Sequence, residues 1–155
     1  SQAHPQGDAI EERPTLRDRR VLVADADENV RSAAHVLLER FGCVVETARD
    51  GAEAISMARN LLREGGYEAI IADIRLPDMS GHQLMVRLLD FMEAVPLVLM
   101  TGFGYDPGHS IVKARQAGLQ TVLFKPFRLD QLLQGLEKVI SGVGVVRQVT
   151  PAGQA

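Results

Sequence analysis

Four polar side chains, each at the end of an apolar run, are the residues of this sequence whose types suit chemistry. The runs are "RVLVAD" at 20–25, "EAIIAD" at 68–73, "PLVLMT" at 96–101 and "TVLFK" at 121–125, and they end in Asp25, Asp73, Thr101 and Lys125. Carboxylates that converge repel one another unless a cation lies between them, and hard oxygen ligands suit Mg²⁺. A hydroxyl and an ammonium group bind phosphoryl oxygens, so the four together predict a phosphoryl-transfer site.

The sequence contains no loop of the kind that holds a nucleotide. Neither the Walker pattern GxxxxGK[ST] nor GxGxxG follows the first apolar run, and "TGFG" at 101–104 is too short to count. The phosphoryl donor must then be another molecule. The simplest acceptor is a carboxylate that forms an acyl phosphate.

Five apolar runs alternate with five helical patterns along the chain. The remaining run is "CVVETA" at 43–48, and the helical patterns cover 28–41, 51–63, 81–92, about 107–117 and 128–141. Gly42, Gly65 and Gly118 follow three of these patterns, where a left-handed helix cap is expected. Successive parallel strands need a crossover, which a helix supplies. The sequence therefore predicts a three-layer α/β/α sandwich, with its chemistry at the carboxyl ends of the strands.

Length and composition favour one folded domain between two tails. The chain has 155 residues, of which 46% are hydrophobic and 24% charged, as is typical of globular proteins that fold in water. We predict a domain at 19–141, an N-terminal tail or linker at 1–18 and a C-terminal tail or linker at 142–155. The first residue is Ser1 rather than Met, which fits a piece of a longer parent chain.

Charge and apolar patterns disfavour several classes of protein. A formal net charge of −3 with five Phe, two Tyr and no Trp disfavours direct nucleic-acid binding. No run approaches the ~20 apolar residues of a membrane helix. Cys43 is the single cysteine, so no internal disulfide forms and a reducing compartment is favoured. We expect a cytoplasmic protein that binds neither nucleic acid nor a membrane.

The motifs at the strand ends resemble the receiver domain of two-component response regulators. The match covers about 20–141 and rests on "VLVADADE", "IIADIRLPDMSG", "LMTGFG" and "VLFKPF" in combination. The resemblance implies a flavodoxin-like (βα)5 fold, a doubly wound parallel sheet of strand order 2-1-3-4-5. It also implies that Asp73 accepts a phosphoryl group from a histidine kinase or a histidine phosphotransfer protein. The chain would then be no enzyme beyond self-catalysed phosphoryl transfer and dephosphorylation.

The same resemblance assigns a role to each residue at the strand ends. Lys125, followed by Pro126 with a cis peptide bond, would pair with the phosphoryl group. Thr101 would move toward that group on activation. The Arg75 and Phe103 side chains, two residues after Asp73 and Thr101, lie beside the path of water to the acyl phosphate, which predicts slow hydrolysis. Magnesium would be held by Asp25, Asp73 and the backbone carbonyl of Arg75.

Two positions depart from the family. Adjacent acids usually follow the first strand, and the second of them normally binds Mg²⁺ directly, but "ADADE" has Asp25 and then Ala26. This change is expected to weaken magnesium binding, and Asp27, one residue further on, is a candidate substitute ligand. Val122 stands where many receivers have a Tyr or Phe that turns inward when Thr101 moves, so the usual aromatic switch is absent.

The sequence is compatible with three functions. The leading hypothesis is a phosphoacceptor receiver that changes its protein contacts when Asp73 is phosphorylated. Ala26 and Val122 favour an alternative, a non-phosphorylated pseudo-receiver that acts as a protein-interaction module. A small hydrolase with an aspartyl-phosphate intermediate would share Asp73 and Lys125 but needs a second acid catalyst that the sequence does not show. The output would lie in a longer parent chain or in a partner, and the resemblance allows a homodimer.

Overall fold

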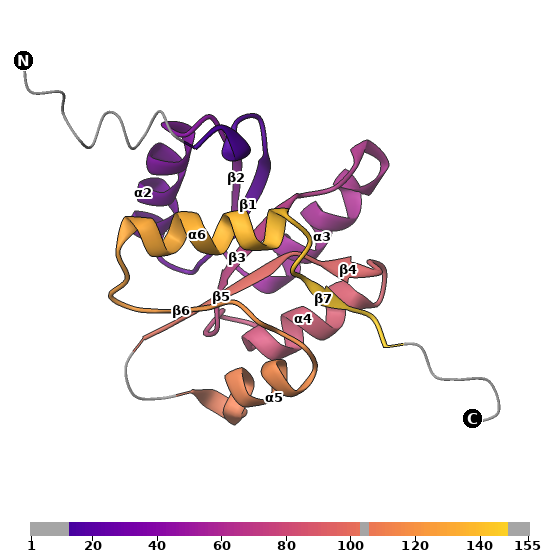
Figure 1. Cartoon of the computed structure of the whole chain (residues 1–155). Helices are drawn as coiled ribbons and strands as arrows, with labels where there is room; N and C mark the ends of the chain where they lie inside the picture. The colour runs from indigo at the N-terminus through magenta and orange to yellow at the C-terminus, as the bar shows by residue number, and fades with distance from the viewer. Residues whose placement is uncertain (1–12, 103–105, 149–155) are drawn as a thin grey trace, which may run out of the picture.

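The computed structural model describes residues 13–102 and 106–148. Its centre is a five-stranded parallel sheet in the order β2-β1-β3-β5-β6 (Figure 1). The predicted doubly wound topology is confirmed, because β5 and β6 are the fourth and fifth strands of this sheet and the short β4 lies outside it. The strands of the sheet are β1 Arg20–Ala24, β2 Val44–Ala48, β3 Ala69–Asp73, β5 Leu97–Thr101 and β6 Val122–Phe124.

Five helices cover the two faces of the sheet, which confirms the predicted three-layer sandwich. Two helices pack on one face with a common apolar core, α2 Glu28–Glu39 and α6 Leu129–Ile140. Three pack on the opposite face, α3 Gly51–Leu61, α4 Gly81–Leu89 and α5 Ser110–Gln116. In Figure 1, α6 lies in front of the sheet, and α4 and α5 lie below it. Short 3-10 turns cover Pro14–Leu16, Leu62–Glu64 and Pro107–His109.

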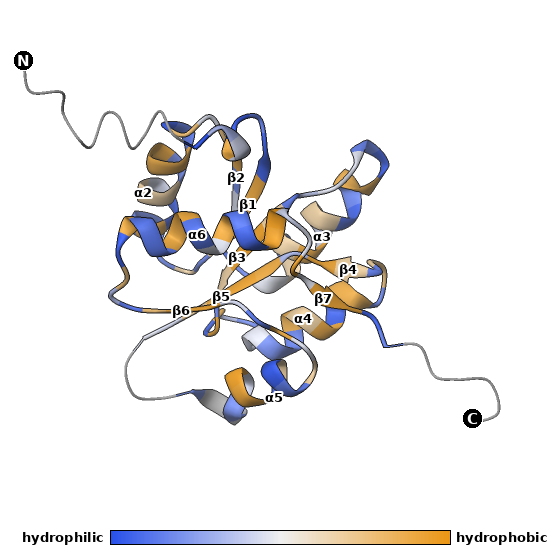
Figure 2. Ribbon diagram, viewed as in Figure 1, coloured by the Kyte–Doolittle hydropathy of each residue, from blue (hydrophilic) through white to orange (hydrophobic). Residues whose placement is uncertain are grey.

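The middle strand β3 explains why the sequence shows an unbroken apolar run before Asp73. Ile70 and Ala72 belong to the core under α3, α4 and α5, whereas Ala69 and Ile71 belong to the core under α2 and α6. A parallel strand covered on both faces needs apolar side chains at every position. Figure 2 shows these central strands as the most hydrophobic part of the ribbon.

Short polar side chains cap the N-termini of three helices by accepting hydrogen bonds from backbone N–H groups of the first turn. Asp27 caps α2 through Asn29, Asp50 caps α3 through Glu53, and Ser80 forms a capping box with Gln83 in α4. Among the described residues, no helix combines the length and the apolar content needed to cross a membrane. The glycines predicted to follow helices have positive φ, 86° at Gly42, 103° at Gly65 and 113° at Gly118.

Two segments outside the alternating strands and helices also pack on the domain. Leu16, in the 3-10 turn before β1, is fully buried in the core under α2 and α6. After α6, the chain forms β7, Val145–Val146, which pairs antiparallel with β4, Ala94–Val95. The approach is close enough that a Cβ on Gly144 would lie 2.7 Å from the carbonyl oxygen of Val95. The C-terminal segment therefore packs on the domain through two residues of antiparallel strand.

Leu16→Ala should lower the free energy of unfolding by about 2–5 kcal/mol, because it removes a fully buried side chain and leaves a cavity. Urea denaturation followed by circular dichroism measures this change. The matched control is Val36→Ala on α2, since Val36 is 55% exposed and its truncation should change stability by less than about 0.5 kcal/mol. Equal stability of the two variants would show that the turn before β1 does not belong to the folded core.

Candidate functional site

The carboxyl ends of β1, β3 and β6 bring three of the predicted residues into contact. The Nζ atom of Lys125 lies 2.7 Å from Oδ2 of Asp73 and 3.7 Å from Oδ2 of Asp25. These contacts follow from the register of the sheet, in which Ala24 pairs with Ala72 and Thr101 with Phe124, so the next residues emerge at the same edge. One ammonium group thus bridges two carboxylates that are far apart in the sequence.

Asp73 is held by both of its carboxylate oxygens. Oδ1 accepts the backbone N–H of Arg75 at 2.8 Å, and Oδ2 accepts a hydrogen bond from Nζ of Lys125. The side chain of Asp73 retains 15% exposure, so a donor molecule in solution can reach it. Partial burial lowers the pKa of Lys125, but its hydrogen bond with Asp73 and the charges of Asp73 and Asp25 raise that pKa above its usual value. Lys125 is therefore charged at neutral pH.

Asp25 is the most buried carboxylate of the site, with 4% of the residue exposed. Its Oδ1 accepts the backbone N–H of Asp27 at 2.9 Å, but among the described residues Oδ2 has no hydrogen-bond partner. Burial raises the pKa of Asp25; the N–H of Asp27 opposes that shift, and the nearby charge of Asp73 adds to it. Oδ2 of Asp25 makes no hydrogen bond within the described part of the chain, and the Lys125 ammonium group lies 3.7 Å from it, so a cation at this end of the sheet would be stabilised by the buried charge of Asp25.

The residues at the end of β1 fit Mg²⁺ only in part. Asp25 and Asp73 supply hard oxygens, but the described residues contain no group of three acidic, histidine or cysteine side chains suited to a metal ion. Ala26 provides no ligand. Asp27 uses Oδ1 to accept the N–H of Asn29 as the cap of α2, at 2.8 Å. A metal bound through Oδ1 of Asp27 would therefore compete with the cap of α2.

The other residues singled out from the sequence occupy different positions around this centre. Thr101 is buried, and its hydroxyl donates to the carbonyl of Gly102 at 3.3 Å rather than to the carboxylates. Its backbone carbonyl accepts the N–H of Lys125 at 2.7 Å, and the Lys125–Pro126 peptide bond is cis, as expected. Val122 is half-buried against the core under α3, α4 and α5. Phe103 lies outside the described residues.

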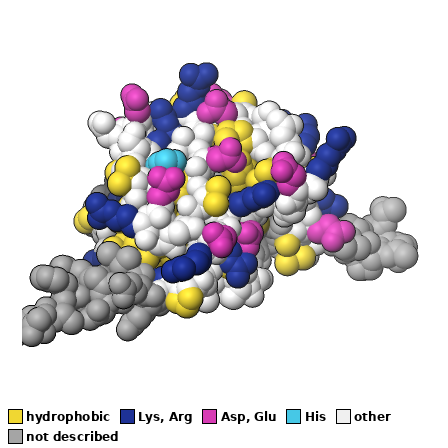
Figure 3. Space-filling view, turned by 90° about the horizontal axis from the view of Figure 1, so that it is seen from above, with side chains coloured by type: hydrophobic (Ala, Val, Ile, Leu, Met, Phe, Trp, Pro, Cys, Tyr) yellow, Lys and Arg dark blue, Asp and Glu magenta, His cyan; other side chains and the backbone are white. Residues whose placement is uncertain are grey.

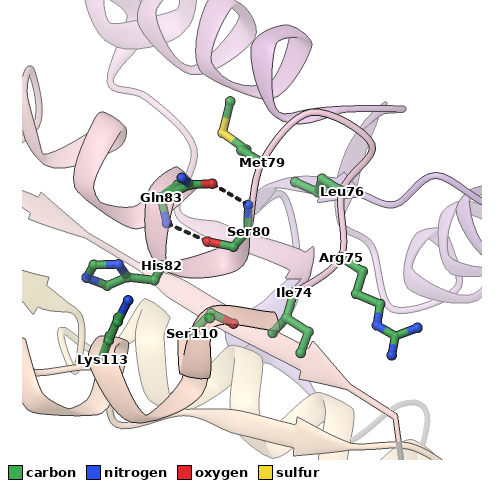
Figure 4. Close-up of a pocket in the computed structure, with 10 residues that line it drawn as sticks. Ile74, Arg75, Leu76, Met79, Ser80, His82, Gln83, Ser110 and Lys113 are labelled. Atoms are coloured by element: carbon green, nitrogen blue, oxygen red, sulfur yellow. Dashed lines mark hydrogen bonds between the residues drawn. The ribbon is translucent and has the colours of Figure 1, made fainter. Parts of the chain in front are cut away.

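A groove with a volume of about 830 Å³ adjoins the segment that follows Asp73. Figure 4 shows Ile74, Arg75 and Leu76 from that segment on one side, with Ser110 and Lys113 of α5 nearby. The dashed lines mark the reciprocal bonds of Ser80 and Gln83 at the start of α4. No sequence pattern predicted this groove, because its lining combines the segment after β3 with α4 and α5, and no local pattern specifies how these parts lie relative to one another.

The charged side chains on the face seen in Figure 3 are interspersed rather than gathered by sign. Acidic and basic groups alternate over the part of this face that is not drawn in grey. A broad basic surface, which binding to a phosphate backbone requires, is not present there.

Asp25→Asn should stabilise the metal-free protein increasingly as the pH rises. Because the pKa of Asp25 is raised in the folded state, its stabilising contribution is complete below the unfolded value of 3.8 and is lost as the pH rises through the folded value. Urea denaturation in EDTA, at several pH values between roughly 4 and 7, measures the difference between variant and wild type. A difference that shrinks with rising pH would contradict the raised pKa.

The chain matches one protein family and is similar in sequence to curated proteins of greater length. The family described as "Response regulator receiver domain" matches residues 21–137. The transcriptional regulatory protein ZraR of Escherichia coli O157:H7 is 27% identical over 132 residues, which are 85% of this chain and 29% of ZraR. The ZraR protein of Salmonella typhimurium is 28% identical over 121 residues, 78% of this chain and 26% of the relative. The chain thus spans less than a third of the length of these curated relatives.

Two solved structures of related sequence share the fold of this chain. The structure of FixJ-N superposes with a TM-score of 0.70 at 26% identity, covering 82% of this chain and 97% of that chain. The response regulator protein TrrA from Thermotoga maritima, solved in complex with Mg²⁺-BeF, superposes with a TM-score of 0.63 at 26% identity, covering 78% and 98%.

Proposed function

Since this chain belongs to the family of response regulator receiver domains, we propose that Asp73 accepts a phosphoryl group from a phosphohistidine of a histidine kinase or a histidine phosphotransfer protein. The observation that carries the proposal is the placement of Lys125, whose Nζ atom lies 2.7 Å from Asp73 and 3.7 Å from Asp25. An acceptor carboxylate, a fixed cation beside it and a second, buried carboxylate suit phosphoryl transfer to an aspartate.

In the transfer step, a carboxylate oxygen of Asp73 attacks the phosphorus atom of the phosphohistidine. The new P–O bond forms as the P–N bond breaks, and the histidine leaves as a neutral imidazole after taking a proton from water. Lys125 stabilises the charge on the phosphoryl oxygens as a fixed ammonium group. Magnesium, when bound, supplies further charge neutralisation, and the groups that would hold it are Asp25, Asp73, the backbone carbonyl of Arg75 and, in place of Ala26, Asp27.

The response to phosphorylation passes through the end of β5. Thr101, whose hydroxyl donates to Gly102 in this structure, would instead donate to a phosphoryl oxygen, which moves the end of β5. Val122 stands in place of the usual aromatic switch, so the shift is carried by the end of β5 and by α5. Two copies would pair through α5, β6 and α6, where Val112 and Phe124 are each more than half exposed.

Membership of the receiver family also bears on the domain bounds, the output and the location of this protein. The receiver domain occupies 19–141, and the linkers at 1–18 and 142–155 have described parts that pack on it. The output lies in a longer parent chain or in a separate partner, as the greater length of the curated relatives suggests. The chain acts in the cytoplasm as a phosphoacceptor, and it catalyses no reaction beyond its own phosphorylation and dephosphorylation.

Intact-mass spectrometry after incubation with acetyl phosphate and Mg²⁺ tests this proposal. The expected result is the addition of one phosphoryl group to the wild-type protein and its slow loss after the donor is removed. A protein that stays unmodified with acetyl phosphate and with several phosphorylated histidine phosphotransfer proteins would contradict the proposal.

Ala26 favours a second candidate function, a pseudo-receiver that binds partners without being phosphorylated. The missing carboxylate removes a direct metal ligand, and magnesium is needed for the chemistry of the first candidate. A magnesium titration followed by NMR separates the two. Saturable shifts of residues around Asp73 support the phosphoacceptor, whereas no response at millimolar Mg²⁺ supports the pseudo-receiver.

Ala26→Asp should lower the Mg²⁺ concentration for half-maximal phosphorylation roughly tenfold, because an added carboxylate beside Asp25 and Asp73 raises the negative charge that holds the cation. The matched control is Ala26→Asn, which adds nearly the same volume without the charge. Phosphorylation rates measured at a series of Mg²⁺ concentrations give the comparison. Indistinguishable curves for the two variants would mean that position 26 does not face the metal.

A further inference from the structure

We propose that Asp78 is a positioning residue for phosphoryl transfer, which fixes the segment 74–80 by holding its tip against the N-terminus of α3. This inference rests on the proposed function, because the segment carries the Arg75 backbone that adjoins Asp73. Asp78 itself takes no part in the chemistry. Its effect is to keep two backbone groups of Arg75, the N–H and the carbonyl, in place beside the acceptor.

The first observation is a two-pronged contact between Asp78 and α3. Oδ1 of Asp78 accepts the backbone N–H of Gly51 and Oδ2 accepts that of Ala52, each at 2.8 Å. Asp50, the residue before the helix, accepts the next N–H, that of Glu53, also at 2.8 Å. The first-turn N–H groups, which have no partner within a helix, are thus shared between a local cap and a residue 27 positions away.

A second observation shows that the segment and α3 also interlock through apolar atoms. A Cβ on Gly51 would overlap the side chain of Met79, the residue next to Asp78. The glycine therefore lets Met79 lie directly against the start of α3 in this conformation. Met79 also packs against the core under α3, α4 and α5, so the tip of the segment is held by packing as well as by charge.

Hydrogen bonds within the segment connect this tip to the acceptor. The Leu76 N–H donates to the Met79 carbonyl at 3.2 Å, and the Gly81 N–H donates to the Ile74 carbonyl at 3.0 Å. Arg75 and Ser80 form an isolated antiparallel bridge between these two bonds. The segment is therefore a closed hairpin-like turn with Asp78 and Met79 at one end and Asp73 at the other, where the Arg75 N–H meets Oδ1 of Asp73.

A release of the tip would free the end of this turn that lies opposite Asp73. The backbone of Arg75 would then lose the constraint that aligns its N–H with Asp73 and aims its carbonyl. Groups that orient metal ligands in this indirect way typically change metal affinity or activity by about 10- to 100-fold when removed. A residue that only capped α3 would change stability without changing the Mg²⁺ dependence of phosphorylation.

Asp78→Ala and Asp50→Ala form a matched pair that separates these two roles. Both remove a carboxylate that caps the first turn of α3, but only Asp78 belongs to the segment after Asp73 and ties that segment to the helix. The measurement is the initial rate of phosphorylation by acetyl phosphate over a range of Mg²⁺, with urea denaturation of each variant. Asp78→Ala should raise the half-maximal Mg²⁺ concentration about tenfold, and Asp50→Ala should leave it unchanged at a similar loss of stability.

Asp78→Asn keeps one acceptor oxygen and should give an intermediate Mg²⁺ dependence, and it serves if the alanine variant does not fold. The same Mg²⁺ dependence in the Asp78 and Asp50 variants would overturn the inference. Calorimetric titration with Mg²⁺ alone makes the same comparison without phosphorylation. If the wild type binds Mg²⁺ but accepts no phosphate, the proposed function fails, while the difference in affinity between the variants still decides the role of Asp78.

Discussion

Asp73→Asn should reduce phosphorylation by acetyl phosphate to background, at least about 10³-fold below the wild-type rate. The carboxylate is the nucleophile, and an amide of the same size retains neither its charge nor its ability to form an acyl phosphate. The same change removes the closer of the two anionic partners of Lys125, whose Nζ lies 2.7 Å from Oδ2 of Asp73 and 3.7 Å from Oδ2 of Asp25. Since removal of one of two neighbouring carboxylates also reduces their repulsion, the variant is expected to remain folded.

The measurement is intact-mass spectrometry over time at fixed acetyl phosphate and Mg²⁺. Asp90→Asn is the matched control, because Asp90 is an exposed carboxylate at the opposite end of α4 from the site. It should be phosphorylated at the wild-type rate. Incorporation into the Asp73 variant at a rate like that of the control would exclude Asp73 as the acceptor.

Lys125→Ala should slow phosphorylation by about 10²-fold at saturating Mg²⁺. Lys125 is the one cation that contacts both carboxylates among the described residues, and its fixed charge is available to the phosphoryl oxygens without rearrangement. Its loss leaves Asp25 and Asp73 facing each other without compensation, so the resting site becomes more repulsive as well. Both effects raise the barrier to the approach of an anionic donor.

Two comparison variants separate these effects. Lys125→Arg keeps a positive charge but changes the geometry of a point charge to that of a planar fork, and an intermediate rate is expected. Lys138→Ala, on an exposed position of α6, removes the same type of residue far from the acceptor and should leave the rate unchanged. A rate for Lys125→Ala within about threefold of wild type would show that the ammonium group does not stabilise the transfer.

The sequence was sufficient for the sheet and for the contact at its edge. Uninterrupted apolar runs with intervening helices specify parallel strands, and parallel strands deliver their last residues to one edge. Asp25, Asp73 and Lys125 meet there for that reason, although their separations in the chain show no local pattern. The glycine caps were also predictable, because a positive φ after a helix is a local property of one residue.

Features that depend on distant pairs were not predictable in this way. The contact of Asp78 with Gly51 joins residues from separate crossovers, and the pairing of β7 with β4 involves two strands of two residues each. The role of Asp27 was ambiguous because a carboxylate at this position suits either a metal or a helix cap. In the structure, its Oδ1 atom serves the cap. Local sequence patterns do not decide between competing partners for one side chain.

The central claim, that Asp73 is the phosphoacceptor, is tested most directly by locating the acyl phosphate. Borohydride reduces an aspartyl phosphate to homoserine, and trypsin releases residue 73 in the peptide 64–75, "EGGYEAIIADIR", in which it is the single aspartate. After treatment of the wild type with acetyl phosphate and Mg²⁺, we expect homoserine at position 73, and only when the donor was present. Conversion of a different carboxylate, or none in protein exposed to an active donor, would contradict the claim.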